Sequence, residues 1–330
     1  MLAVAGDFDA ASTAAEGVLD LRADAQEAYH LIPLEHSRAR AFDLLAFVAI
    51  RREEDALQRG ALRAALEECD RAPVRDVVFE ANVLTNLAIF AREFGDDGYV
   101  RARLERMHGS EQIGAQRYEI LRSLAWSNAL EGDHLGTFRE LREASDAAPT
   151  TATKIRAIVD RAYFAGELGQ GLIAREEIDF ALRLSERVDW DAVAFEESEL
   201  DALLHLGVAT IRIDLERARE LVGRYRKLKA KLPPDVLAAT DRRARAEELT
   251  AEAAIAAAEG NAVRARALLL EAFETWNARG YRVRAALVAR ELVALDGGDR
   301  FAAYVAEEAA RRPQSWLAIG FGRRAGPTLV

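Results

Sequence analysis

Residues 260–272 read GNAVRARALLLEA, and this stretch decides the fold that we expect. Gly260 would end one helix, because glycine readily takes the backbone conformation that terminates helices. Ala265, Leu269 and Ala272 lie five, nine and twelve residues further on, and such small and apolar residues would pack a second helix closely against the first. The stretch therefore predicts a helical hairpin.

The same pattern recurs along the chain at a fixed interval, which is the mark of a repeat protein. Gly95, Gly132 and Gly169 are 37 residues apart, and Gly260 and Gly297 are again 37 apart. Because alanine is common in this chain, the evidence for a repeat is that residues at several fixed distances from these glycines are small or apolar together. Seven residues before the glycines stand Ala88, Ala125, Ala162, Ala253 and Arg290, of which only Arg290 is charged. The columns five, nine and twelve residues after them are Val100, Thr137, Ala174, Ala265 and Ala302; Leu104, Leu141, Ile178, Leu269 and Ala306; Met107, Ala144, Ala181, Ala272 and Ala309.

Two regions depart from this spacing. The 91 residues between Gly169 and Gly260 suit two longer units, and residues 213–222 supply the turn and second helix of one of them. Only five residues precede Gly6, which fits the same columns, so the first helix of that pair would be almost absent. The register is weak over residues 22–75 and 196–207.

Three stretches resemble the turn and second helix of tetratricopeptide repeats: residues 6–11, 215–221 and 260–272. Pro149, five residues after Ala144, matches the proline that ends such a unit. The resemblance implies an all-α, α-α superhelix, a solenoid of about eight antiparallel helix pairs over residues 1–318. A flexible tail would follow at 319–330. The alternative is an irregular helical bundle with a degenerate hairpin pattern.

The composition is typical of a helical chain and argues against binding to nucleic acid or to a membrane. Half of the 330 residues are hydrophobic, glycine and proline are sparse, and the net charge is −10, whereas phosphate binding needs a surplus of cations. The basic residues 224–231 are more simply the solvent face of a helix near its C-terminus. No apolar run reaches the roughly 18 residues of a membrane span, and Cys69 is the single cysteine. We expect a cytoplasmic protein.

No catalytic motif stands out. The histidines lack the spacing of zinc ligands, and the paired carboxylates are typical of solvent-facing helices. The glycines within residues 166–171 follow no strand, so they indicate a hairpin turn and not a phosphate-binding loop. We therefore expect no catalytic residues, no metal and no cofactor, and a protein that is not an enzyme.

The resemblance implies that the first helix of each pair lines a concave, partner-binding groove. Arginine and tryptophan are favoured at interfaces, so we expect the centre of this groove at Arg122, Trp126, Arg156 and Tyr163. Alternatively, Trp126 packs against the next unit. Counting back from the turn glycines gives the groove residues as Asn82, Thr85, Ile89 and Arg92, then Glu119, Arg122 and Trp126, then Arg156, Val159 and Tyr163.

The last full unit suggests a narrower role. Residues 272–281, then Arg284-Ala285-Ala286 and Leu292, resemble the last helical pairs in the sensor region of bacterial LuxR/MalT-type transcription regulators. That resemblance implies a region that holds an effector or a partner protein in its groove, although no DNA-binding domain is present in these residues. The alternative is a free-standing cytoplasmic adaptor that mediates protein–protein interaction or peptide sensing.

Overall fold

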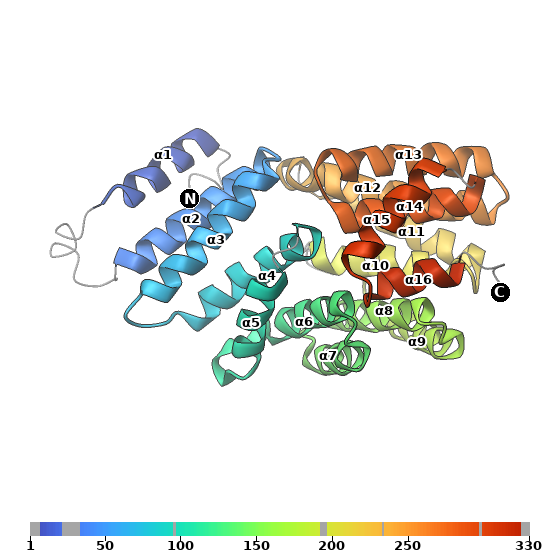
Figure 1. Ribbon diagram of the computed structural model, residues 1–330, viewed down its shortest axis with the longest axis horizontal. Coiled ribbons are helices and arrows are strands. Elements are labelled where there is room, and N and C mark those ends of the chain that lie inside the picture. The colour runs from blue at the N-terminus through green and yellow to red at the C-terminus, as the bar shows by residue number, and fades with distance from the viewer. Residues whose placement is uncertain are drawn as a thin grey trace. The chain divides into compact units, whose positions relative to one another are not determined.

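The computed structural model describes residues 7–21, 34–94, 97–191, 197–232, 234–296 and 299–324. These residues form sixteen α-helices and one 3-10 helix, with no strand among them, as Figure 1 shows. The predicted all-α fold class is therefore confirmed. The described residues divide into two compact units. The first unit takes those within 1–91, 95–116 and 233–240, and the second takes those within 92–94, 117–232 and 241–330.

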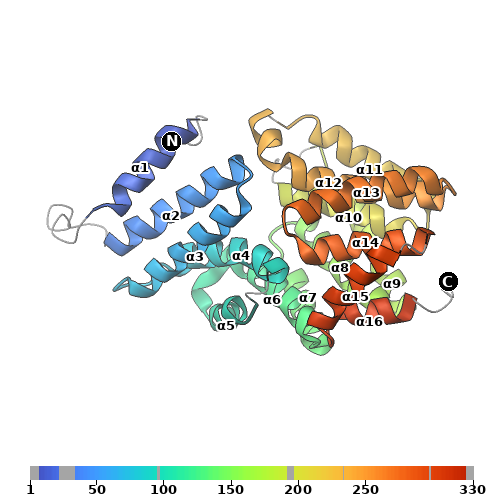
Figure 2. The ribbon, with the colours of Figure 1, turned by 45° about the horizontal axis from the view of Figure 1, so that its top comes forward.

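The first unit is built on packed helices near the N-terminus. Asp7 caps α1 by accepting a hydrogen bond from the Ala10 N–H at 3.1 Å, and Ala11 of α1 packs against Val48 of α2. Helices α2 and α3 lie side by side, as the blue ribbons of Figure 2 show. Its helices are α1 (Phe8–Leu19), α2 (Leu34–Arg51), α3 (Asp55–Arg71), α4 (Val77–Phe94), α5 (Asp97–His108) and the 3-10 helix η2 (Glu111–Gln116).

Three helices of the first unit share a buried ion pair. Arg103 of α5 lies 3.3 Å from Glu80 of α4, and both side chains are at most 5% exposed. Arg103 also donates to Asp70 of α3. Beside this pair, burial and the Glu80 carboxylate raise the pKa of the Cys69 thiol to about 12, so the thiol stays protonated at neutral pH.

The second unit consists largely of adjacent helical pairs. Helix α6 packs on α7, α8 on α9, α10 on α11, and α14 on α15 (Figure 1). A short turn joins the two helices of each of the first three pairs, so their directions are opposite. Its helices are α6 (Arg117–Glu131), α7 (His134–Ala147), α8 (Thr151–Glu167), α9 (Gly171–Ser185), α10 (Glu197–Thr210), α11 (Leu215–Lys229), α12 (Pro234–Ala258), α13 (Ala262–Ala278), α14 (Arg282–Asp296), α15 (Asp299–Arg311) and α16 (Trp316–Arg324).

Three of the predicted turn glycines occupy the left-handed backbone region that glycine alone adopts easily. Gly132, Gly169 and Gly260 have φ angles of 88°, 78° and 78°, and each follows a first helix. At two of these turns the side chain of the next residue caps the second helix: Asp133 accepts from the Gly136 N–H at 2.9 Å, and Asn261 accepts from the Arg264 N–H at 3.1 Å. Gly6, Gly95 and Gly297 lie outside the described residues.

The repeat columns are the packing surfaces of these pairs. In the units around Gly132, Gly169 and Gly260, every column residue is at most 9% exposed. The long interval between Gly169 and Gly260 also has the predicted second helix, α11, which Asp214 caps and on which Val222 is buried. The pattern fails in the last unit, where Ala306 is exposed.

The C-terminal boundary differs from the prediction. We predicted a tail from residue 319, but α16 continues through Arg324. Trp316 and Leu317 are fully buried, and Gly320 is also buried, so helix packing extends past the predicted limit. Within the described parts of the chain, no helix combines the length and apolarity that crossing a bilayer requires.

A pair of glycine substitutions tests the turn. Neither Gly260 nor Gly223 has an atom within 4 Å of the position of an added Cβ, but only Gly260 has a positive φ. We expect Gly260→Ala to lower the free energy of unfolding by about 1 kcal/mol, because alanine is strained in the left-handed region. Gly223→Ala, inside α11, should raise it by up to about 1 kcal/mol. Urea unfolding would measure both, and equal effects would contradict this assignment of the turn.

Candidate functional site

The inner-face cluster of the second unit gathers the four residues predicted at the groove centre. Arg122 and Trp126 come from α6, and Arg156 and Tyr163 come from α8. Arg122, Trp126 and Arg156 meet around Asp160, which the sequence analysis missed, and Tyr163 stacks on Trp126. Arg122 Nε donates to Asp160 Oδ2 at 2.7 Å, Trp126 Nε1 donates to the same oxygen at 3.3 Å, and Arg156 Nε lies 3.5 Å from Oδ1. We call these five residues the inner-face cluster.

The two arginines keep the Asp160 carboxylate charged although it is buried. Burial acts to raise the pKa of the Asp160 carboxyl, but Arg122 and Arg156 outweigh it and hold the pKa below its usual range. Burial lowers the pKa of Arg156, and the neighbouring guanidinium of Arg122 lowers it further. The Asp160 carboxylate is therefore the shared counter-ion of two guanidinium groups. At the partly exposed edge of the cluster, Glu119 lies 3.9 Å from Arg122.

The aromatic side of the cluster is covered by the chain's own last helix. Trp126, Tyr163 and Phe164, which we call the aromatic box, surround Trp316 of α16. Their ring centroids lie 6.1, 5.4 and 5.7 Å from that of Trp316, all with edge-to-face geometry. In Figure 1, α16 lies between α8 and α14, and it contacts α6, α8 and α14.

A buried ion pair joins α8 to α14 next to this helix. Arg290 donates to both oxygens of Glu167, at 2.7 and 2.9 Å, and both side chains are at most 5% exposed. Gly320 of α16 packs directly on the pair. The inner surface predicted as an open groove is thus filled at its aromatic part in the second unit, because α14 and α16 pack on α8.

The structure separates the predicted groove residues into three groups. Glu119, Arg122, Trp126 and Tyr163 are partly exposed, whereas Arg156 and Val159 are 9% and 4% exposed, so neither of these two offers a side chain to a partner in this conformation. Trp126 packs on Phe164, as its alternative interpretation held, while also bonding Asp160. The remaining group lies on α4: Asn82 and Ile89 are exposed, Thr85 is partly exposed, and the Arg92 side chain lies outside the description.

Charged contacts continue along the first helices of the second unit. His205 of α10 lies 3.6 Å from Glu247 of α12, and Glu247 also accepts from Arg284 of α14. The guanidinium of Arg284 lies 4.7 Å from the centre of the Trp276 ring. These contacts tie α10, α12 and α14 together, so these charged side chains bind to one another.

The basic stretch 224–231, at the C-terminal end of α11 and just beyond it, is likewise paired. Lys231 and Arg224 lie 2.8 and 3.3 Å from Asp191, and Lys229 lies 2.5 Å from Glu248. Arg226 contacts Glu252. Acidic partners thus neutralise most of the stretch, which agrees with its interpretation as an ordinary helix face.

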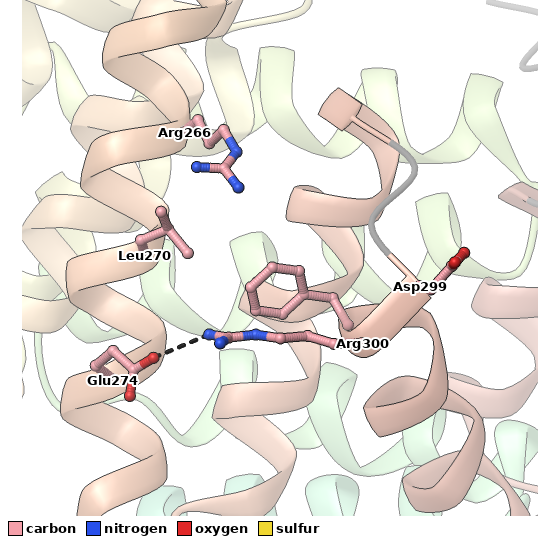
Figure 3. Close-up of a pocket in the computed structure, with 6 residues that line it drawn as sticks. Arg266, Leu270, Glu274, Asp299 and Arg300 are labelled. Atoms are coloured by element: carbon pink, nitrogen blue, oxygen red, sulfur yellow. Dashed lines mark hydrogen bonds and ion pairs between the residues drawn. The ribbon is translucent and has the colours of Figure 1, made fainter.

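A separate hollow of about 510 Å³ opens between α13 and α15, as Figure 3 shows. Arg300 reaches across it to Glu274 at 3.0 Å, and its guanidinium lies 4.5 Å from the centre of the Phe301 ring. Two acids and two arginines line the hollow, so it carries no net charge. It shares no residue with the inner-face cluster. Its lining residues are Arg266, Leu270, Glu274, Asp299, Arg300 and Phe301.

Comparisons with known proteins give likenesses of fold only. No family model and no curated protein sequence matches the chain. The chain is similar to a crystal structure of Rap protein complexed with competence and sporulation factor, with 14% identity, a TM-score of 0.49, and coverage of 84% of this chain and 80% of that one. It is also similar to BtubC (BKLC) from P. vanneervenii, with 16% identity, a TM-score of 0.38, and coverage of 82% and 90%. These values are too low to assign a function.

Proposed function

We propose that the chain is a non-catalytic helical-repeat scaffold that binds a protein or peptide partner at the inner-face cluster. One observation carries the proposal: this surface already holds a short helix, α16, through the aromatic box. A surface that recognises one helix by an indole ring offers the large, rigid aromatic contacts on which protein interfaces depend.

The exposed edge of the cluster supplies the polar part of recognition. Arg122 is fixed in place by Asp160, and its side chain keeps 20% of its exposure, while Glu119 keeps 35%. A guanidinium that is already oriented loses little conformational entropy when it binds a further acceptor. A peptide lying along α6 would therefore meet an aromatic surface and an arginine–glutamate pair.

The test begins with identification of a partner and ends with affinity. Tagged full-length chain would be recovered from its native cells, and each bound protein identified by mass spectrometry and purified. We expect Trp126→Ala and Glu119→Arg to raise the Kd at least tenfold, since interface anchors typically contribute 2 kcal/mol or more. Glu119→Arg is included because Glu119 is partly exposed, so that this substitution should change binding without disturbing the fold.

The matched control is Leu172→Ala on α9, whose side chain is 82% exposed and lies outside the inner-face cluster. Its Kd should stay within about twofold of wild type. Binding that is lost in Leu172→Ala but kept in both inner-face variants would refute the proposed surface.

The narrower roles remain predictions. An effector-binding region of a LuxR/MalT-type transcription regulator and a free-standing cytoplasmic adaptor would use the same surface. The identity of the recovered partner distinguishes them: a transcription regulator's effector protein would favour the first role, and an unrelated pair of proteins bridged by the chain would favour the second.

A further inference from the structure

Helix α16 fits its position through three consecutive features. Trp316 fills the aromatic box, and Leu317 is buried among residues of α6, α7, α8 and α14. One turn later, Gly320 lets the helix lie directly on the Glu167–Arg290 pair, because a Cβ there would fall well inside contact distance of the Glu167 carboxylate and 3.1 Å from Arg290 Nη1. We call the surface that receives these residues the seat.

The connection to α16 is also closely packed. An added Cβ at Gly132, in the turn between α6 and α7, would lie 2.8 Å from the Cβ of Gln314. The seat is therefore a shaped surface, and its fit to α16 depends on small residues at defined places.

The fit of α16 nevertheless has a defect. Trp316 Nε1 is buried and, among the described residues, has no hydrogen-bond partner. A buried donor without an acceptor weakens binding. In addition, α16 has nine residues, too few to form a stable helix away from a supporting surface. Its docking and its folding are therefore coupled, and a better-fitting helix could replace it.

We propose that the seat is an exchangeable binding site for a helix of a partner protein, and that α16 occupies it until that partner arrives. The inference rests on the proposed function and names the partner's chemistry. The partner segment is an amphipathic helix with an aromatic residue, an adjacent leucine and a glycine four positions after the aromatic residue.

The glycine requirement follows from the ion pair. Glu167 cannot move away from an added methyl group without losing its two hydrogen bonds to Arg290, and both side chains are enclosed. A larger residue at that position of an incoming helix is excluded in the same way. The seat therefore selects its occupant by the size of one residue.

The experiment uses this size limit against α16 itself. Gly320→Ala should force α16 off the seat while leaving the seat unchanged, and alanine also favours the helix itself. Gly223→Ala is the matched control, because it lies in α11 with no atom within 4 Å of an added Cβ. The probe is a fluorescein-labelled synthetic peptide with the sequence of residues 313–324, and its binding to each full-length protein is measured by fluorescence anisotropy.

We expect the peptide to bind Gly320→Ala at least ten times more tightly than it binds wild type or Gly223→Ala. A peptide carrying alanine at the position of Gly320 should bind at least ten times more weakly to Gly320→Ala than the unaltered peptide. Equal affinity for the three proteins, or equal affinity of the two peptides, would overturn the proposal.

The oligomeric state of the same proteins, measured by sedimentation, tests whether α16 of a second copy of the chain occupies the seat. If wild type forms dimers that Gly320→Ala abolishes, α16 of a second copy occupies the seat, and a partner's helix is ruled out. A native partner whose binding depends on Trp126 but does not change in Gly320→Ala would end this inference and leave the proposed function intact. If the peptide exchanges as expected but no native partner depends on Trp126, the proposed function fails instead.

Discussion

Replacing Arg290 with alanine is expected to lower the free energy of unfolding by about 3–5 kcal/mol, because it leaves the Glu167 carboxylate buried without its counter-ion. The Glu167 side chain is only 3% exposed, and two hydrogen bonds from Arg290 now compensate for its lost hydration. Urea unfolding followed by circular dichroism would measure the change. We expect helix α8 to be among the elements that are destabilised, since Glu167 is its last residue.

Two further variants show whether burial causes this effect. Arg300→Ala breaks a pair of similar length, 3.0 Å to Glu274, but both of those side chains are more than 60% exposed, so we expect a loss of about 1 kcal/mol or less. A double variant, Arg290→Met with Glu167→Leu, removes both buried charges and should recover most of the stability. If Arg290→Ala and Arg300→Ala cost the same, the buried pair does not contribute as described.

Replacing Asp160 with asparagine is expected to cost about 3–5 kcal/mol at neutral pH, because the side chain keeps its size while the buried Arg156 and the partly buried Arg122 lose their shared carboxylate. In wild type, the negative charge of Asp160 lies between Arg122 and Arg156. In the variant this charge is gone, and the two positive charges repel each other over a short distance. The affinity of the proposed partner should fall as well, since Asp160 holds Arg122 and Trp126 in position.

The cost should depend on pH in a defined direction. The pKa of Asp160 is lower in the folded chain than in the unfolded chain. Its stabilising effect is therefore complete above the unfolded pKa, near 4, and is lost as the pH falls through the folded pKa. The difference between wild type and Asp160→Asn should be constant from about pH 5 to 7 and should shrink below about pH 4.

Urea unfolding of both proteins at a series of pH values checks this dependence. Asp191→Asn is the control: Asp191 also has a lowered pKa, set by its hydrogen bond from Lys231, but it is exposed to solvent, which screens the pair. We expect a far smaller change in that variant. A wild-type advantage over Asp160→Asn that persisted unchanged at pH 3 would show that the charge of Asp160 does not stabilise the fold.

The repeat was predictable because it depends on contacts that lie close together in the sequence. A turn glycine and the apolar columns on either side of it report the packing of one helix on its neighbour, and this packing repeats with the sequence. Gly132, Gly169 and Gly260 illustrate this, since their positive φ angles and buried neighbouring columns are as expected. The same spacing carried no information on the last helix, so the predicted tail began too early.

The candidate site was predictable only in part. Counting back from the glycines gave Arg122, Trp126, Arg156 and Tyr163, which the structure brings together, because equivalent positions of the first helices recur at fixed distances from the turns. It missed Asp160, although a carboxylate four residues after Arg156 on one helix is the spacing of an ion pair.

By itself, the sequence determined an all-helical chain of paired, closely packed helices, because that pattern is local and periodic. One position departs from the pattern: the charged Arg290 stands in a column that is otherwise alanine, and the sequence does not identify the residue that Arg290 contacts. Only the tertiary structure decided the rest: Glu167, 123 residues away, pairs with Arg290, and Trp316 enters the aromatic box. Such contacts depend on how a superhelix curves over several repeats, and no spacing within a single repeat records that curvature.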